Sequence, residues 1–286
     1  MVRGIESFKK WFSTNDSQYV IIGGTACDIL MNHYGLDFRS TKDIDIVLII
    51  EAIDKDFGMK FWEYIELAEY KHCKKSSSIP EFYRFVDPKS SEFPQMIELF
   101  TRKLDNINLP NSSRITPLPI DDDISSLSAI LLNDDYYDLL NKGKKNVDGL
   151  SVLSAEYLIL FKIKAWLDLT YRKNNGETID SKNIKKHKND VFRLYELVNP
   201  SITISISSSI LKDVRLFIEA MENEDINIKD IGLKQYTKNQ ILDDLENMFI
   251  LETNQWFSVL PIFSKICKAK CGRRLNWLLS TDTCNN

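Results

Sequence analysis

The sequence of 286 residues lacks the features that mark membrane proteins, secreted proteins and globally basic nucleic-acid binders. No apolar run approaches the roughly 20 residues that a membrane-spanning helix needs. The N-terminal stretch MVRGIESFKKWF predicts an amphipathic helix over residues 5–14 and contains no signal-peptide core. The net charge is −4, so contact with a nucleic acid would have to come from a local basic patch. We therefore expect a cytoplasmic protein with no membrane partner.

Cysteine is also scarce, and its five positions form no framework. An odd number of scattered cysteines predicts reduced thiols rather than disulfides. A closely spaced pair near the C-terminus could be taken for half of a zinc site, but no second Cys or His pair lies near it in the sequence. Free thiols are therefore the favoured interpretation for all five: Cys27, Cys73, Cys267, Cys271 and Cys284.

Only ten glycines occur, yet two of them adjoin in the stretch YVIIGGTA. The apolar run predicts a short buried strand that Gly23 and Gly24 end, followed by a helix from Thr25 to about Tyr34. Glycines at such a point let the first N–H groups of the helix approach an anion. The Thr25 hydroxyl would then cap the helix or contact a phosphate. The Walker and Rossmann patterns are both absent, and the two glycines taken alone favour a plain tight turn.

Paired carboxylates follow in the stretch DIDIVLII, which predicts a strand over residues 43–50. Residues two apart on a strand share a face, so Asp43 and Asp45 project together. Two parallel carboxylates repel each other unless a cation lies between them, and hard divalent ions such as Mg²⁺ prefer oxygen ligands. A solvated strand end is the alternative, which the apolar residues that follow disfavour.

A third carboxylate lies in the stretch QMIELFTRK, where alternation places Glu98 on the same face as Met96 and Phe100. A lone carboxylate on an apolar face is costly unless it is paired or binds metal. Beside the strand of the paired carboxylates, Glu98 would complete a cluster able to hold two divalent ions. The alternative is a salt bridge with Arg84 or Arg102.

The pattern of strand-like and helical segments changes near residue 150, which predicts two domains, 1–150 and 151–286. Strand-like and helical segments mix in the first part, including a helix around residues 60–70 and strand-like pieces at 82–87, 114–120 and 125–132. The second part is rich in apolar periodicity of the helical kind. We expect a mixed α/β domain followed by a mostly helical one, with helices over residues 155–173 and 187–198.

The order GGTA, helix, DID and then a carboxylate on a later strand resembles the nucleotidyltransferase superfamily of the DNA polymerase β type. That resemblance implies the superfamily's α/β fold with a mixed sheet. It also implies that a nucleoside triphosphate is the substrate and that Mg²⁺ or Mn²⁺ is the cofactor. By position, the implied metal ligands are Asp43, Asp45 and Glu98, and the implied nucleotide-binding residues are Gly23, Gly24 and Thr25.

The helical part resembles the AbiEii family of bacterial abortive-infection toxins, which carries a K-x-x-A helix and a downstream R-D-x-x-D-L helix. Lys162 and Asp190 match the lysine and the first aspartate of these motifs. Asn189 and Arg193 depart from the second motif, and residues beyond 194 are not covered. The family implies catalytic roles for Lys162 and Asp190 and a toxin that transfers a nucleotide to RNA, such as tRNA, or to protein. It also implies a cognate antitoxin as a partner.

Several alternatives remain open for this half. Lys162 could be a surface lysine, with Lys164 in its place, and Asp190 could simply pair with Lys186. A small-molecule nucleotidyltransferase that modifies an antibiotic, or a nucleotide-binding module without activity, would show the same motifs. The densest basic run precedes the predicted Asp190 helix and is either a solvated face or a guide for the phosphates of a nucleotide or RNA: Lys182, Lys185, Lys186, His187 and Lys188.

Overall fold

The computed structural model describes residues 2–39, 41–49, 51–72, 81–101 and 133–252. The strand-like pieces expected at 114–120 and 125–132 lie outside these residues, as do four of the five cysteines. The fifth, Cys27, is buried and is a free thiol. Among the described residues, none of the helices combines the length and the apolar character needed to cross a membrane.

A seven-stranded mixed sheet forms the first layer of the fold, in the order β3-β4-β5-β2-β1-β7-β6. The pairs β2–β5 and β1–β7 are parallel, and the other neighbours are antiparallel. This arrangement confirms the predicted mixed α/β sheet. Its strands are β1 (Tyr19–Ile22), β2 (Asp43–Leu48), β3 (Lys71–His72), β4 (Glu81–Val86), β5 (Met96–Thr101), β6 (Lys144–Val147) and β7 (Leu150–Leu153).

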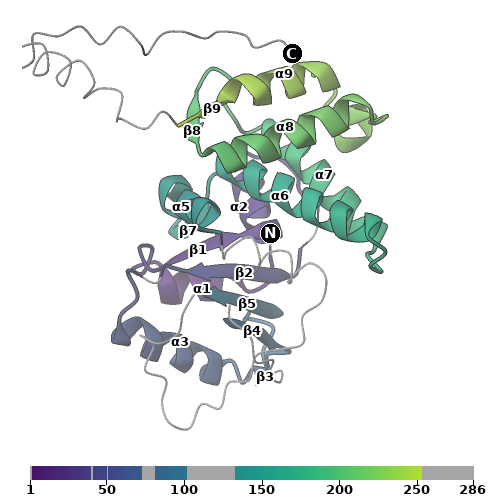
Figure 1. Cartoon of the computed structure of the whole chain (residues 1–286). Helices are drawn as coiled ribbons and strands as arrows, with labels where there is room; N and C mark the ends of the chain where they lie inside the picture. The colour runs from purple at the N-terminus through teal and green to yellow at the C-terminus, as the bar shows by residue number, and fades with distance from the viewer. Residues whose placement is uncertain (1, 40, 50, 73–80, 102–132, 253–286) are drawn as a thin grey trace, which may run out of the picture.

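Helices make up most of the second half of the described chain, as the sequence predicted. Figure 1 shows the sheet in the lower part of the molecule and α6 to α9 stacked above it. The helices are α1 (Ile5–Phe12), α2 (Gly23–His33), α3 (Lys55–Leu67), α5 (Asp134–Gly143), α6 (Ala155–Asn174), α7 (Ser181–Tyr195), α8 (Ser208–Glu222), the 3-10 helix η1 (Ile228–Ile231) and α9 (Lys238–Met248).

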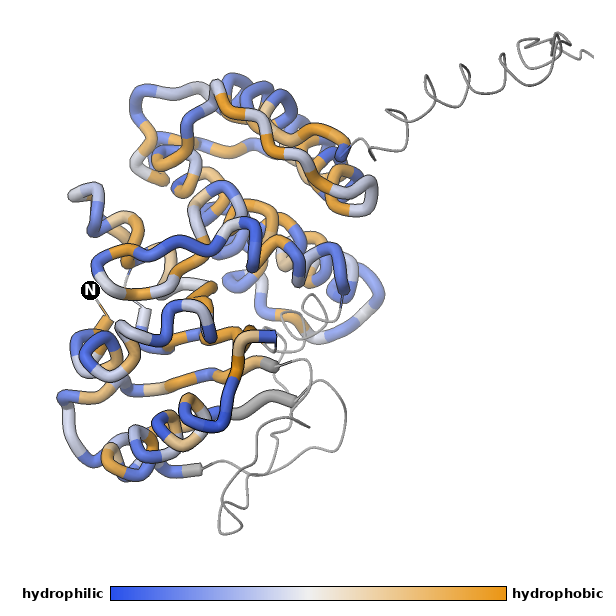
Figure 2. The backbone as a smooth tube through the Cα atoms, turned by 90° about the vertical axis from the view of Figure 1, so that its left-hand side faces the viewer, coloured by the Kyte–Doolittle hydropathy of each residue, from blue (hydrophilic) through white to orange (hydrophobic). Residues whose placement is uncertain are grey.

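A short parallel pair of strands, β8 (Ile204–Ile206) and β9 (Phe249–Leu251), interrupts the helical half and was not predicted. The strand β9 lies within a segment that also carries helical apolar periodicity, so the sequence pattern there pointed to helix. The strand β8 lies within the short polar stretch of residues 201–209, for which no element was predicted. In Figure 2 the helical segments alternate between apolar and polar colours, as expected for helices that bury one face.

Side-chain caps place several helix starts earlier than the sequence predicted. The Asp54 side chain accepts a hydrogen bond from the Phe57 N–H, so α3 begins at Lys55 rather than near residue 60. The Asp180 side chain accepts from the Lys182 N–H, so α7 begins at Ser181 rather than near residue 187. The basic run therefore lies within α7, and the prediction that it precedes this helix was wrong.

One continuous hydrophobic core joins the sheet to the helices above it. The predicted domain boundary at residue 150 coincides with the first residue of β7, so the sheet continues to Leu153. On one side of the sheet, α1 and α3 pack together through aromatic contacts such as Phe12 with Phe57. The side chains of Asp43 and Asp45 alternate with Ile44 and Ile46 along β2, which directs the carboxylates away from those two isoleucines.

Candidate functional site

A cavity of about 450 Å³ lies between the sheet and helices α6 and α7. Its lining comes from the start of α2, the loop before β2, strands β2, β4 and β5, and one side of each of the two helices. Six of the eight residues singled out from the sequence line it: Gly23, Gly24, Asp43, Asp45, Glu98 and Lys162. Thr25 and Asp190 are buried and are not part of the lining.

The three carboxylates Asp43, Asp45 and Glu98 form one side of the cavity, which we call the acidic wall. Strands β2 and β5 run parallel in a register that pairs Asp45 with Glu98. The side chains of these two residues are hydrogen-bonded to each other. The prediction that Glu98 lies beside the paired carboxylates is thus confirmed by the sheet register.

The electrostatics of the acidic wall are unfavourable for three negative charges. Burial raises the pKa of Asp43, and the charge of Asp45 raises it further. Burial also raises the pKa of Asp45. Burial and the neighbouring Asp45 together raise the pKa of Glu98 to about 9. The protonated form of Glu98 is therefore favoured, and in that form its carboxyl O–H donates the hydrogen bond to Asp45.

Arg84 supplies positive charge to this wall. Its Nε lies 2.8 Å and its Nη2 2.7 Å from Glu98 Oε1, so the salt bridge considered from the sequence is present. Arg84 lowers the pKa of Glu98, but less than burial raises it. The acidic wall thus combines the two interpretations of Glu98, as a member of the carboxylate cluster and as the partner of an arginine.

The donor chemistry of the acidic wall suits a hard divalent cation, because all three side chains offer oxygen and their charged forms are disfavoured without one. Within the described residues, however, no three His, Cys, Asp or Glu side chains converge closely enough to hold a metal ion. Arg84 occupies one oxygen of Glu98. The three carboxylates therefore have the right chemistry for a divalent cation, but they are not already arranged around one point. The metal site stays a prediction.

The two adjacent glycines bring the start of α2 against the acidic wall. Gly23 has a φ of +67°, and a Cβ there would lie 1.8 Å from Asp45 Oδ2. The Gly24 N–H donates a hydrogen bond to the Asp45 carboxylate. The helix N-terminus thus contacts an anion, which in this structure is the carboxylate of Asp45, and its contact with a nucleotide phosphate stays a prediction.

Thr25 has a different place from the one expected. Helix α2 begins at Gly23, two residues early, so Thr25 lies inside the helix and cannot be its cap. Its side chain is fully buried, and its hydroxyl donates a hydrogen bond to the backbone carbonyl of Asp43. Thr25 therefore holds the first residue of β2 in position rather than reaching into the cavity.

The cavity lining also contains cations that surround one buried carboxylate, and we call Arg39, Lys162 and Asp190 the basic wall. Asp190 is 0% exposed. Its Oδ2 lies 3.0 Å from Lys162 Nζ and 2.9 Å from Arg39 Nη2, and its Oδ1 lies 3.2 Å from Arg39 Nε. Arg193 Nη1 adds a longer contact of 3.4 Å to Oδ1.

These contacts settle the charge states of the basic wall. Burial opposes a charged Asp190, but Lys162 and Arg39 outweigh it and hold its pKa well below the usual range. Burial likewise opposes a charged Lys162, and Asp190 outweighs it, so that the pKa of Lys162 is raised. Three cations, counting Arg193, thus surround one anion, and an excess of positive charge remains beside the cavity.

The alternatives for the helical residues can now be decided. Lys162 is only 5% exposed in its side chain and is not a surface lysine. Lys164 binds Asp213 at 2.9 Å, so it takes no part in the basic wall. Lys186 lines the cavity with His187.

Arg39 is a residue of the site that the sequence did not reveal. It lies in the loop before β2, where no strand or helix pattern draws attention to it. The only available signal was its position four residues before Asp43, close to the paired carboxylates. Arg193, which looked like a departure from the family motif, contributes a cation to Asp190.

No protein-family model matches the chain, and no curated protein matches it. Among solved structures, the chain is similar to an antigenic nucleotidyltransferase-like protein from Paracoccidioides brasiliensis, with 16% identity, a TM-score of 0.40, and coverage of 80% of this chain and 93% of that one. It is also similar to the antibiotic-resistance factor ANT(2'')-Ia, with 10% identity, a TM-score of 0.32, and coverage of 67% and 88%. At these values the similarity establishes no activity for this chain.

Proposed function

We propose that this protein is a metal-dependent nucleotidyltransferase that moves a nucleoside monophosphate from a nucleoside triphosphate to an acceptor. The observation that carries the proposal is that the carboxylates of the acidic wall and the cations of the basic wall line one cavity of about 450 Å³. A triphosphate is the ligand class that needs both: cations on one side and, on the other, carboxylates that bind its divalent counterions. The cavity volume lies in the range of about 300–1,000 Å³ typical of ligand sites.

The acidic wall is assigned the reacting phosphate. Asp43 and Asp45 would hold Mg²⁺ or Mn²⁺, and Glu98 would complete the ligand set. When bound, the ion would supply positive charge at the phosphate and at the attacking oxygen. Glu98 is also the residue assigned to accept the proton of the attacking hydroxyl, because its buried carboxylate takes up a proton readily once it is ionised.

The basic wall is assigned the remainder of the triphosphate. Lys162 and Arg39 offset the negative charge that the leaving pyrophosphate develops. Asp190 binds both cations but does not itself line the cavity, so it is a positioning residue that fixes them toward the phosphates. Gly23 and Gly24 line the same cavity, and the sequence resemblance assigns them to the bound nucleotide.

Radiolabelled nucleoside triphosphates test the proposal directly. Wild-type protein, incubated with each of the four nucleotides, Mg²⁺ or Mn²⁺ and total RNA, is expected to transfer label to an acceptor. Asp45→Asn should lower the rate by about 100-fold or more, since it removes charge from the reacting centre. Asp148→Asn is the matched control, because Asp148 is 60% exposed and pairs only with His33 at 3.1 Å among the described residues. Transfer that is absent, or equal in the Asp45 variant, contradicts the proposal.

A toxin role with a cognate antitoxin rests on the sequence resemblance of Lys162, Asp190 and their neighbours to the AbiEii motifs. It predicts growth arrest on induction that depends on Asp43 and Asp45. Raised antibiotic resistance without arrest would favour the small-molecule alternative. A protein that binds nucleotide and metal but transfers nothing, to RNA, protein or small molecule, would be the non-catalytic module.

A further inference from the structure

A second cavity, of about 390 Å³, lies farther along the same two helices. Its α6 side consists of Trp166, Thr170 and Lys173, which are spaced four and three residues apart and so form one stripe of the helix. Glu224, just after α8, adds one carboxylate. We call this space the outer cavity.

Helix α7 supplies the other side of the outer cavity with a matching stripe. Ser181, Ile184, Lys185 and Lys188 follow the spacing i, i+3, i+4 and i+7. The stripes of the two helices thus border an open groove that lysine and hydroxyl groups line together with Trp166 and Ile184. Lys173, Ser181 and Lys185 are exposed in this groove.

The outer cavity is separate from the proposed active site but shares its helices. The first cavity uses Lys162 and Ala165 on α6, and Lys186 and His187 on α7. Lys162 and Thr170 are eight residues apart, which is about 12 Å along a helix at 1.5 Å per residue. The basic run of α7 is therefore divided, with Lys185 and Lys188 in one cavity and the two residues between them in the other.

The charge and the hydrogen-bonding groups of the outer cavity suit a phosphate. Three lysines face one carboxylate, Glu224. Lys188 is paired with Glu224, and Lys173 donates to the Ser181 hydroxyl. The Thr170 hydroxyl oxygen is buried without a hydrogen-bond partner among the described residues, which is costly unless a ligand or water satisfies it. A phosphate group offers several strong acceptor oxygens to ammonium and hydroxyl donors.

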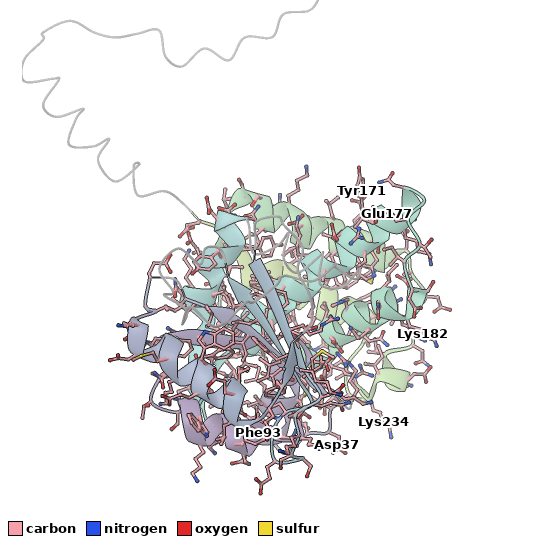
Figure 3. All side chains as sticks on the ribbon, turned by 90° about the horizontal axis from the view of Figure 1, so that it is seen from below. Asp37, Phe93, Tyr171, Glu177, Lys182 and Lys234 are labelled. Carbon is pink, nitrogen blue, oxygen red and sulfur yellow. The ribbon has the colours of Figure 1, made fainter. Side chains whose placement is uncertain are left out.

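We propose that the outer cavity binds a backbone phosphate of a nucleic-acid strand whose reacting end lies in the first cavity. The role of this strand as the acceptor rests on the proposed function. The binding of its phosphate in the outer cavity does not depend on that function. Adjacent residues of α7 serve the two cavities, so one strand can contact both across this helix. Figure 3 shows Lys182, from the same basic run, at the edge of the molecule that also carries Tyr171 and Glu177.

The binding can be measured without catalysis. Fluorescence anisotropy with a labelled single-stranded RNA, in the absence of metal and nucleoside triphosphate, is expected to show salt-dependent binding to wild-type protein. Lys173→Gln/Lys185→Gln should weaken binding at least 10-fold and reduce the slope of log K against log salt by about 0.7 for each phosphate that the variant no longer neutralises. Lys229→Gln/Lys234→Gln, which removes two exposed lysines of the same half of the chain, should leave both quantities unchanged.

The variant Thr170→Val tests whether RNA binding needs the cavity itself, because it changes no charge and should not destabilise the fold. It removes only a buried hydroxyl that has no partner among the described residues, so it should raise the melting temperature while it weakens RNA binding. Equal losses in the Lys173/Lys185 and Lys229/Lys234 variants would overturn the proposal, as would Thr170→Val binding RNA like wild type. Displacement of the RNA by millimolar inorganic phosphate at constant ionic strength would overturn the assignment to a nucleic-acid strand in favour of a free phosphate.

The same assay separates this proposal from the proposed function. Asp45→Asn should bind the RNA like wild type, because Asp45 lies in the first cavity only. RNA binding without any nucleotidyl transfer would support the proposed role of the outer cavity and contradict the proposed activity. Nucleotidyl transfer without RNA binding at the outer cavity would support the activity and contradict the role of the outer cavity.

Discussion

The buried carboxylates in the two walls of the main cavity have pKa values shifted in opposite directions. In the acidic wall the pKa values of Asp43, Asp45 and Glu98 are all raised, so the protein alone does not neutralise these carboxylates. In the basic wall the pKa of Asp190 is lowered, because cations surround it. The protein alone thus neutralises the carboxylate of the basic wall, with positive charge left over, whereas the acidic wall favours any ligand that brings positive charge.

Removing the centre of the basic wall should have the largest effect on stability. Asp190→Ala leaves Lys162 and Arg39 without their buried counterion, which we expect to lower the free energy of unfolding by about 3–5 kcal/mol. Urea denaturation measures the change. Glu177→Ala is the control, since it breaks the pair of Arg172 with a carboxylate that is 50% exposed, and it should cost at most about 1 kcal/mol. Equal costs for the two variants would show that the basic wall is not a buried network.

The acidic wall should respond to ligands instead. Metal and nucleoside triphosphate at about 100 times the dissociation constant should stabilise wild-type protein by about 2.7 kcal/mol, because they bind only the folded state. Asp43→Asn/Asp45→Asn should lose this response and be no less stable without ligand. Thermal melts with and without both ligands give the comparison. If variant and wild type respond alike, the carboxylates do not bind the metal.

The contact between the walls and α2 predicts a smaller effect. Gly23→Ala should cost about 2 kcal/mol or more, because an L-residue at φ +67° is strained and its Cβ would meet Asp45. Gly35→Ala isolates the strain alone, since Gly35 has a similar φ of +72° and open space around its Cβ position. We therefore expect chemical denaturation to show a larger loss for Gly23→Ala than for Gly35→Ala. A similar loss for both would mean that Asp45 moves away freely.

The pH dependence of stability should be the smallest of the four effects. The pKa of Glu98 is raised to about 9 in the folded protein, above its value near 4.3 in an unfolded chain. The folded state thus binds the proton more tightly, so stability from this group is full below the unfolded pKa and falls as pH rises towards 9. Between pH 7 and 8 we expect a loss of about 1.3 kcal/mol without metal, close to the limit of about 1.4 kcal/mol per pH unit for one proton. Glu98→Gln should flatten this slope, and an unchanged slope would contradict the assignment.

The sequence was sufficient for the sheet side of the site and insufficient for the helix side. Alternation along DIDIVLII and QMIELFTRK placed Asp45 and Glu98 correctly, because period-2 patterns report directly on strand faces. The sequence could not show that Asp190 binds Arg39, since the two are 151 positions apart and joined only by the packing of α7 over the loop before β2. Thr25 was misplaced because helix starts depend on local contacts that periodicity does not resolve.

The ion pair between Arg39 and Asp190 can form only late in the synthesis of the protein, because Asp190 follows Arg39 by 151 positions. Strands β1, β2 and β5 are complete once Thr101 has been added, so a growing chain carries all three carboxylates of the acidic wall early. The counterion that fixes Arg39 and Lys162 arrives only with α7. Domains fold from the N-terminus as the chain emerges, and the cavity therefore has no second wall until residues 181–195 have left the ribosome. Any activity that needs both walls is withheld from the nascent chain until then.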